Sequence, residues 1–181
     1  WVLGRCYRGA GSLSKGSPCV QPAATWHKQM RRSELRGHMD GALEAAEAAA
    51  NRGEVPVGAV LVMGDRVLAQ AGNRTRELND PTAHAEMLVI RAACAALGSE
   101  RLTGADLYVT LEPCPMCAAA ISFARIGRLY YGASDPKSGG VEHGPRVFEH
   151  PQCHHKPEVY DSISEAASAR LLRRFFAERR D

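Results

Sequence analysis

Long apolar runs are missing from this chain of 181 residues. None reaches the roughly 18 consecutive apolar positions of a membrane-spanning helix, so no such helix is expected. The first residues also lack an apolar segment before a cleavage site, so a secretory signal is not expected. Hydrophobic residues still make up 45% of the chain and charged residues 24%, which predicts one globular domain with an apolar core.

The net charge of +3 is distributed unevenly. Residues 1–38 carry seven Lys and Arg and one acidic residue, Glu34. Residues 1–30 contain Gly, Ser and Pro with little apolar periodicity. Residues 1–38 are therefore expected to be a disordered leader or a non-native extension, with Met30 and Met39 as plausible natural starts. An Arg-rich, acid-poor leader is also typical of an organelle transit peptide, and this alternative stays open.

From residue 39 to 181 the apolar pattern predicts alternating helices and strands. The expected helices are Ala42–Asn51, His84–Leu97, Pro115–Ala124 and Ile163–Arg180. The expected strands are Val57–Met63, Arg66–Ala71, Leu107–Thr110 and Arg128–Gly132. The first two strands should form a hairpin around Gly64-Asp65, and Ser162 with Glu165 should form a capping box for the last helix.

This order of elements predicts an α/β fold, a three-layer α/β/α sandwich with a mixed sheet of about five strands. The hairpin strands should be antiparallel and the later strands parallel. Residues 139–157 are rich in Gly and His and are expected to be irregular.

Two short segments carry the strongest functional pattern, one with His84 and Glu86 and the other with Cys114 and Cys117. Two cysteines three positions apart at a helix N-terminus can direct both sulfurs to one ion, and the helix dipole favours their thiolates. Together with His84 they give three protein ligands. The fourth position of a tetrahedral zinc then stays open for water, as catalysis requires. One Zn²⁺ per chain is expected.

Glu86 lies two residues beyond His84, so its carboxylate is expected to reach the metal-bound water without binding the metal. A carboxylate in that place can take the proton of the water and return it to the substrate. Glu86 is therefore the predicted catalytic residue.

Other roles for the cysteines stay open. The even number of cysteines, six, allows disulfides, although a chain with a full core does not need them. The C-x-x-C pair could be a redox pair, but Pro113 before Cys114 does not suit a thioredoxin-like unit. A structural zinc would need a fourth ligand, which Cys153, His154 or His155 could supply.

The H-x-E and P-C-x-x-C segments together are the signature of zinc deaminases. Beyond them, from about Met39 to the end, the chain resembles bacterial tRNA-specific adenosine deaminases of the cytidine deaminase superfamily. The similar stretches are Glu54–Ala59, Gly72–Arg74, Asp80–Glu86, Leu107–Cys117, Ala124–Arg128, Tyr131–Ala133, Phe175-Phe176 and Arg179-Arg180.

The resemblance implies a cytoplasmic homodimer with the cytidine deaminase fold. It implies conversion of the wobble adenosine of a tRNA anticodon to inosine, by zinc-hydroxide attack with Glu86 as the proton shuttle. It also implies that Asn73 contacts the target base or its sugar and that Asp135 lies beside the preceding nucleotide. From the residues alone, both would be ordinary turn residues.

The tRNA partner rests mainly on this resemblance, because residues 39–120 are acidic overall. The last helix and the pair Arg125 and Arg128 supply basic charge that could contact phosphates. The helix arginines are Arg170, Arg173, Arg174, Arg179 and Arg180. A deaminase of a free base or nucleoside, such as guanine or cytosine, is the main alternative, since that superfamily shares the zinc signature.

Overall fold

A five-stranded mixed sheet forms the centre of residues 32–179, the part of the chain that this computed structural model describes, with side chains from residue 37 onward. Its strands are β1 (Gly58–Met63), β2 (Arg66–Gly72), β3 (Asp106–Leu111), β4 (Arg128–Ala133) and β5 (Glu158–Tyr160). They lie in the order β2-β1-β3-β4-β5. Strand β1 is antiparallel to β2 and β3, and β3, β4 and β5 are parallel to one another. The predicted mixed sheet is confirmed.

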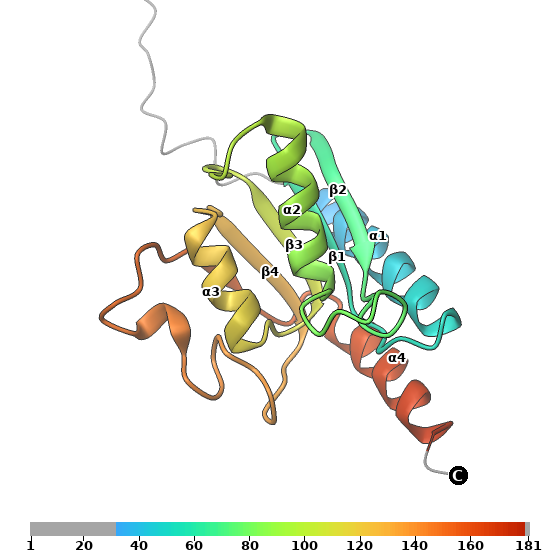
Figure 1. The fold of residues 1–181 in the computed structure, drawn as a ribbon. Coiled ribbons are helices and arrows are strands. Elements are labelled where there is room, and N and C mark those ends of the chain that lie inside the picture. The colour runs from blue at the N-terminus through green and yellow to red at the C-terminus, as the bar shows by residue number, and fades with distance from the viewer. Residues whose placement is uncertain (1–31, 180–181) are drawn as a thin grey trace, which may run out of the picture. The chain divides into compact units, whose positions relative to one another are not determined.

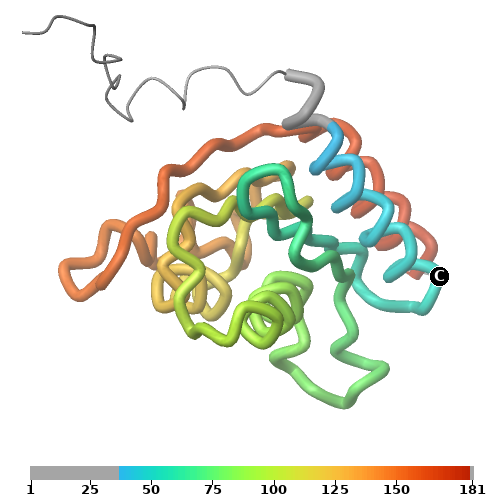
Figure 2. Tube along the Cα trace, turned by 90° about the horizontal axis from the view of Figure 1, so that it is seen from above, coloured from blue at the N-terminus to red at the C-terminus, as the bar shows by residue number. Residues whose placement is uncertain are grey.

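Helices cover both faces of the sheet (Figure 1). One face carries α2 (Ala85–Leu97) and α3 (Pro115–Phe123). The other carries α1 (Arg32–Asn51) and α4 (Glu165–Ala177), which lie side by side (Figure 2). The result is the expected three-layer α/β/α sandwich. Within the described residues, no helix combines the length and hydropathy that a membrane crossing needs.

Helix α1 packs unusually close to the β1–β2 hairpin. A Cβ atom at Gly58 would collide with the carbonyl of Ala42, and one at Gly72 with the carbonyl of Ala45. The hairpin itself turns at Gly64, whose φ of 59° suits glycine. Glycines at the two ends of the hairpin therefore allow the Ala-rich face of α1 to lie directly on the strands that lead to the candidate site.

Helix α1 begins at Arg32, well before its predicted start at Ala42 and before the predicted domain boundary at residue 39. Its first turns are polar, so apolar periodicity does not mark them. The His38 ring nevertheless lies 5.1 Å from the Tyr108 ring, centroid to centroid, which ties this part of the helix to β3. Residues 1–31 lie outside the described part of the chain, so the structure does not test the disorder predicted for them.

A chain truncated to begin at Arg32 is expected to fold and deaminate like the full chain, because it keeps all of α1. A chain that begins at Met39 should also deaminate, since residues 1–38 hold none of the predicted site residues. Its melting temperature should be lower, because removing the His38 ring from its place beside Tyr108 costs about 1 kcal/mol. Thermal unfolding and activity of both truncated chains test this, and an inactive or unfolded 39–181 chain would show residues 32–38 to be essential.

The predicted capping box of α4 is wrong. The helix begins at Glu165, and its N-cap residue Ser164 makes no side-chain capping bond. Both Ser162 and Ser164 have positive φ angles, 58° and 57°, instead of the extended conformation that a capping serine needs. The Ile163 N–H donates to the Tyr131 carbonyl at 2.9 Å, so the chain stays attached to β4 until just before the helix begins.

The sequence patterns did not predict β5. This strand has three residues and pairs only with β4, with one half-buried side chain between two exposed ones. So short an edge strand shows no clear period of two. Within residues 139–157, predicted to be irregular, the structure has one short 3-10 helix, η2 (Val147–Glu149).

Candidate metal centre and adjoining cavity

Three predicted metal ligands meet at the edge of the sheet where β2, β3 and β4 end. His84 is the N-cap residue of α2, and Cys114 is the N-cap residue of α3. The His84 Nδ1 atom lies 3.5 Å from Cys117 Sγ and 3.7 Å from Cys114 Sγ. All three potential ligand atoms lie within 4.8 Å of one another. The fold thus gathers residues from two separate segments at two helix N-termini.

The spacing of these atoms fits a zinc ion. Typical Zn–S and Zn–N bonds in a tetrahedral site place nitrogen and sulfur about 3.6 Å apart. In the described part of the chain no fourth His, Cys, Asp or Glu joins the cluster. Cys153 instead donates to the His155 carbonyl at 3.1 Å, and His155 Nε2 lies 2.7 Å from the Ile126 carbonyl. These residues do not supply the fourth ligand that a structural zinc would need.

The surroundings of the two sulfurs favour a thiolate. A hydrogen bond from the Cys117 thiol, with a further contribution from His84, lowers the pKa of Cys114 to about 4. The pKa of Cys117 is raised because the Cys114 sulfur accepts its proton. A bound divalent cation would deprotonate both thiols. The hydrogen bond between the His84 ring and the Cys114 sulfur raises the pKa of His84.

Glu86 lies in the first turn of α2, and its side chain is almost fully buried, with 3% of the residue exposed. Among the described residues, its Oε2 atom has no hydrogen-bond partner. Burial raises the pKa of this carboxyl group. A buried carboxylate oxygen without a protein partner costs free energy, and such groups concentrate at functional sites. A water molecule or substrate at the adjacent metal site would supply the missing partner.

A cavity of about 190 Å³ is lined by two of the three ligands, His84 and Cys114. It is smaller than the roughly 300–1,000 Å³ of pockets for drug-sized ligands, which suits a single base. Its walls come from the segment before β1, the end of β3, the loops after β2, β3 and β4, and the starts of α2 and α3. They are formed by Val55, Val57, Asn73, Thr75, His84, Glu86, Leu111, Glu112, Cys114, Asp135 and Ser138.

Both residues predicted to bind the substrate line this cavity. Asn73 is buried, and its Oδ1 atom accepts a 2.8 Å hydrogen bond from the Ala85 N–H at the start of α2. This bond fixes the side-chain amide and leaves its NH₂ group as the remaining donor. Asp135 Oδ1 accepts the N–H groups of Lys137 at 3.1 Å and Ser138 at 3.0 Å, so it also forms the turn that its sequence context indicated.

Glu112, for which the sequence patterns predict no role, lies in the cavity wall with its side chain fully buried. Burial raises the pKa of Glu112, but hydrogen bonds from His143 and Asp135 outweigh it and lower the pKa. The only sequence indication is the position of an acidic residue at the end of a buried strand, directly before the Pro-Cys pair.

Two arginines suggested as RNA contacts lie away from the cavity. Arg128 Nε and Nη2 each lie 2.6 Å from an Asp106 carboxylate oxygen, at the edge of the sheet where β3 begins. Arg125, after the end of α3, donates to the His154 carbonyl at 2.8 Å. The charge of Arg128 is thus matched inside the protein.

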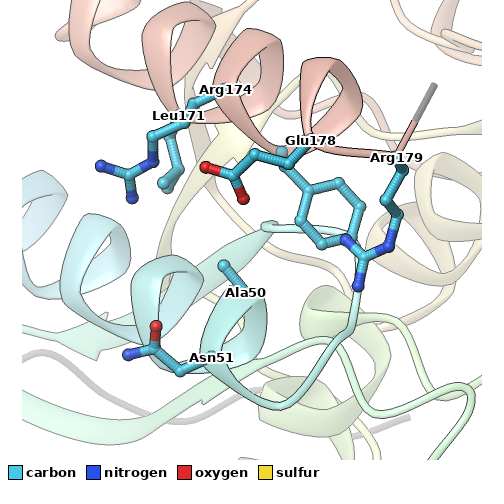
Figure 3. Close-up of a pocket in the computed structure, with 7 residues that line it drawn as sticks. Ala50, Asn51, Leu171, Arg174, Glu178 and Arg179 are labelled. Atoms are coloured by element: carbon cyan, nitrogen blue, oxygen red, sulfur yellow. The ribbon is translucent and has the colours of Figure 1, made fainter. Parts of the chain in front are cut away.

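A larger hollow of about 530 Å³ lies between the ends of α1 and α4 (Figure 3). Arg174 of α4, and Glu178 and Arg179 just after its end, face the last turn of α1 there. The Arg179 guanidinium lies 3.7 Å from the centroid of the Phe175 ring. None of the three predicted zinc ligands lines this hollow, so its size does not make it the reaction site.

Comparison with known proteins identifies the family. Residues 32–133 match the cytidine and deoxycytidylate deaminase zinc-binding region. A tRNA-specific adenosine deaminase from Agrobacterium fabrum is 67% identical over 82% of this chain and 97% of its own length. The chain belongs to the tRNA-specific adenosine deaminase family. The member from Bacillus subtilis is 43% identical over 83% of this chain and 92% of its own length.

Solved structures agree with this assignment. One, from work on A-to-I editing by tRNA:A34 deaminases at the wobble position of transfer RNA, is 66% identical, with a TM-score of 0.74 over 75% of this chain and 99% of that one. A guanine deaminase from Bacillus subtilis is 31% identical, with a TM-score of 0.54 over 80% of this chain and 93% of that one. The chain is therefore a zinc-dependent hydrolase of the deaminase fold with one zinc ion, as predicted.

Proposed function

We propose that the chain deaminates adenosine to inosine at the wobble position of tRNA anticodons. The observation that carries this proposal is the 67% identity to a tRNA-specific adenosine deaminase over 97% of that protein's length. The guanine deaminase at 31% identity keeps free-base deamination as the rival, because it shares the fold. The much higher identity to the tRNA enzyme favours RNA as the substrate.

We assign the zinc ligands as His84, Cys114 and Cys117. When bound, zinc supplies a Lewis acid that brings the pKa of a coordinated water close to neutrality. The Glu86 carboxylate takes a proton from the water that attacks C6 of adenine. It delivers this proton to the ring nitrogen. It then takes the second proton, from the hydroxyl group now on C6, and passes it to the departing amine, so adenosine and water give inosine and ammonia.

Two further residues hold the substrate in this proposal. The fixed NH₂ group of Asn73 donates to the target base or its sugar. Asp135 lies beside the nucleotide that precedes the target adenosine. The target base has to leave its stack to enter so small a cavity, and this costs little in the single-stranded loop of an anticodon.

The exposed face of α4 is the proposed contact for RNA phosphates. The side chains of Arg170, Arg173 and Arg174 are exposed, and no other described side chain forms an ion pair with them. Near the end of this helix, Arg179 donates to the Gly53 carbonyl at 3.2 Å, two residues before Val55 of the cavity wall. The C-terminal end of this basic helix therefore lies close to the segment that forms one wall of the cavity.

The proposed homodimer has a candidate surface on α3. The Phe123 side chain is 67% exposed and borders a hollow of about 160 Å³ whose walls include Pro145 and Val147. A large exposed aromatic side chain beside an apolar hollow is typical of a protein interface. A tRNA substrate favours the cytoplasm as the location.

The decisive experiment compares turnover of an anticodon stem-loop adenosine with turnover of guanine, cytosine and free adenosine in one buffer. We expect the RNA to react faster than every free compound. Affinity for the RNA should fall with salt, with a log–log slope of roughly −0.7 for each phosphate that the protein binds. A neutral base releases no counterions and should show almost no salt dependence.

The triple variant R170A/R173A/R174A should flatten this slope by about 0.7 for each phosphate that the variant no longer binds. Its turnover of saturating RNA should change little. The control R66A/R101A removes two exposed arginines near the opposite edge of the sheet, of which Arg101 pairs with Glu100 at 3.4 Å, and it should leave the slope unchanged. Faster turnover of any free base than of RNA would refute the tRNA assignment and favour the rival.

A further inference from the structure

Glu112 links the end of β3 to an entire loop of the cavity wall. Its buried carboxylate accepts five hydrogen bonds. Oε1 accepts the backbone N–H groups of Val141 at 3.2 Å, Glu142 at 2.9 Å and His143 at 3.0 Å. Oε2 accepts the Asp135 N–H at 3.0 Å and lies 2.7 Å from His143 Nδ1. Every donor comes from residues 135–143, the segment that follows β4.

This segment wraps closely around the carboxylate, and two of its positions, Gly139 and Gly140, have no room for a side chain. A Cβ atom at Gly139 would lie 2.5 Å from the Glu112 carboxyl carbon, and one at Gly140 would lie 2.5 Å from the Pro115 nitrogen. The Gly140 N–H also donates to the Pro113 carbonyl at 2.9 Å. The N–H groups replace the water that a buried carboxylate loses, so the charge and the loop conformation depend on each other.

The same segment carries Asp135 and Ser138 into the cavity wall. The Asp135 carboxylate is oriented by the N–H groups of Lys137 and Ser138, and its own N–H is held by Glu112. The two carboxylate oxygens of Glu112 already accept five hydrogen bonds from the loop, so they are not available to a reacting atom of the substrate. Any effect of Glu112 on the reaction should therefore pass through the loop.

We propose that Glu112 is a positioning residue that sets the conformation of residues 135–143 and thereby holds Asp135 against the nucleotide preceding the target adenosine. This inference rests on the proposed function, which gives Asp135 its role toward RNA. Glu112 lies in the wall of the cavity, yet it acts on the substrate through another residue.

The substitution Glu112→Gln tests the proposal because it keeps the size of the side chain and replaces one acceptor oxygen with an NH₂ donor. At least one loop N–H is then left without its acceptor. We expect kcat/KM for an anticodon stem-loop to fall about 10²-fold, as for other displacements near 1 Å at a reaction site. Zinc content should stay at one per chain, and hydrogen exchange should accelerate at the amides of Asp135 and residues 141–143.

Glu112→Asp keeps the charge on a shorter side chain and should recover part of the missing activity. The matched control is Asp106→Asn, which alters another buried carboxylate at the opposite edge of the sheet. This control can lower the melting temperature but should leave kcat/KM within about twofold. If Asp106→Asn lowers the melting temperature but not kcat/KM, the loss of kcat/KM in Glu112→Gln cannot be explained by a general decrease in stability.

A double-mutant cycle with Asp135→Ala distinguishes positioning from a merely structural role. If Glu112 acts through Asp135, adding Glu112→Gln to Asp135→Ala should reduce kcat/KM by less than about threefold, because both changes remove one contribution. Multiplicative losses, loss of zinc, or wild-type kcat/KM in Glu112→Gln would overturn the proposal. If the wild-type protein does not act on RNA, the proposed function fails, while the exchange measurement still tests whether Glu112 holds the loop.

Discussion

Substituting Glu86 with Ala is expected to abolish turnover while the zinc ion and the fold remain. One general acid–base group contributes about 10²–10⁴-fold to a rate, and Glu86 is assigned several proton transfers, so the loss should reach or exceed the top of that range. Zinc should stay bound because the carboxylate is not among the ligands. Steady-state turnover and elemental analysis of the purified variant measure the two effects.

Stability gives this prediction a second readout. Among the described residues, Glu86 Oε2 is buried without a hydrogen-bond partner, so the wild-type protein carries an unsatisfied carboxylate oxygen in its interior. The isosteric variant Glu86→Gln keeps a polar group in this place but removes the charge whose burial raises the pKa of Glu86, so it should melt no lower than the wild-type protein, although it should be inactive. A variant that retains more than a tenth of wild-type activity would show that another group carries the protons.

The metal centre could be predicted from sequence because each of its two segments is recognisable from neighbouring residues alone. His84 and Cys114 each stand directly before a helix, and a helix N-terminus presents its side chains in a known direction. Only the meeting of the two segments needed the fold. The same holds for the β1–β2 hairpin, whose turn at Gly64 is specified by neighbouring residues.

Other parts of the site could not be predicted, because their partners are distant in the chain or belong to the backbone. The donors to Glu112 are mainly backbone N–H groups that lie 23 to 31 residues away, and backbone groups leave no pattern in a sequence. Arg128 suggested a phosphate contact, but its partner Asp106 is 22 residues away and becomes its neighbour only when β3 and β4 pair. The start of α1 was missed because its first turns are polar.

Loss of a zinc ligand is expected to remove both activity and much of the stability. Cys114→Ser and Cys117→Ser should each contain far less than one zinc per chain, because a hydroxyl is a poorer ligand than a thiolate. Metal binding is linked to folding, and free zinc at about 1,000 times its Kd stabilises the native state by roughly 4 kcal/mol. The melting temperature of the wild-type protein should therefore fall on treatment with a chelator and recover when zinc is added.

The matched control is Cys94→Ser, which makes the same chemical change at a half-buried cysteine of α2 outside the cluster. It should keep one zinc, full activity and the response of its melting temperature to chelator. In the two ligand variants that response should be weak or absent, since little zinc is left to remove. A wild-type protein that is folded and active but free of zinc would refute the assignment, because the proposed reaction requires the zinc ion that His84, Cys114 and Cys117 are assigned to bind.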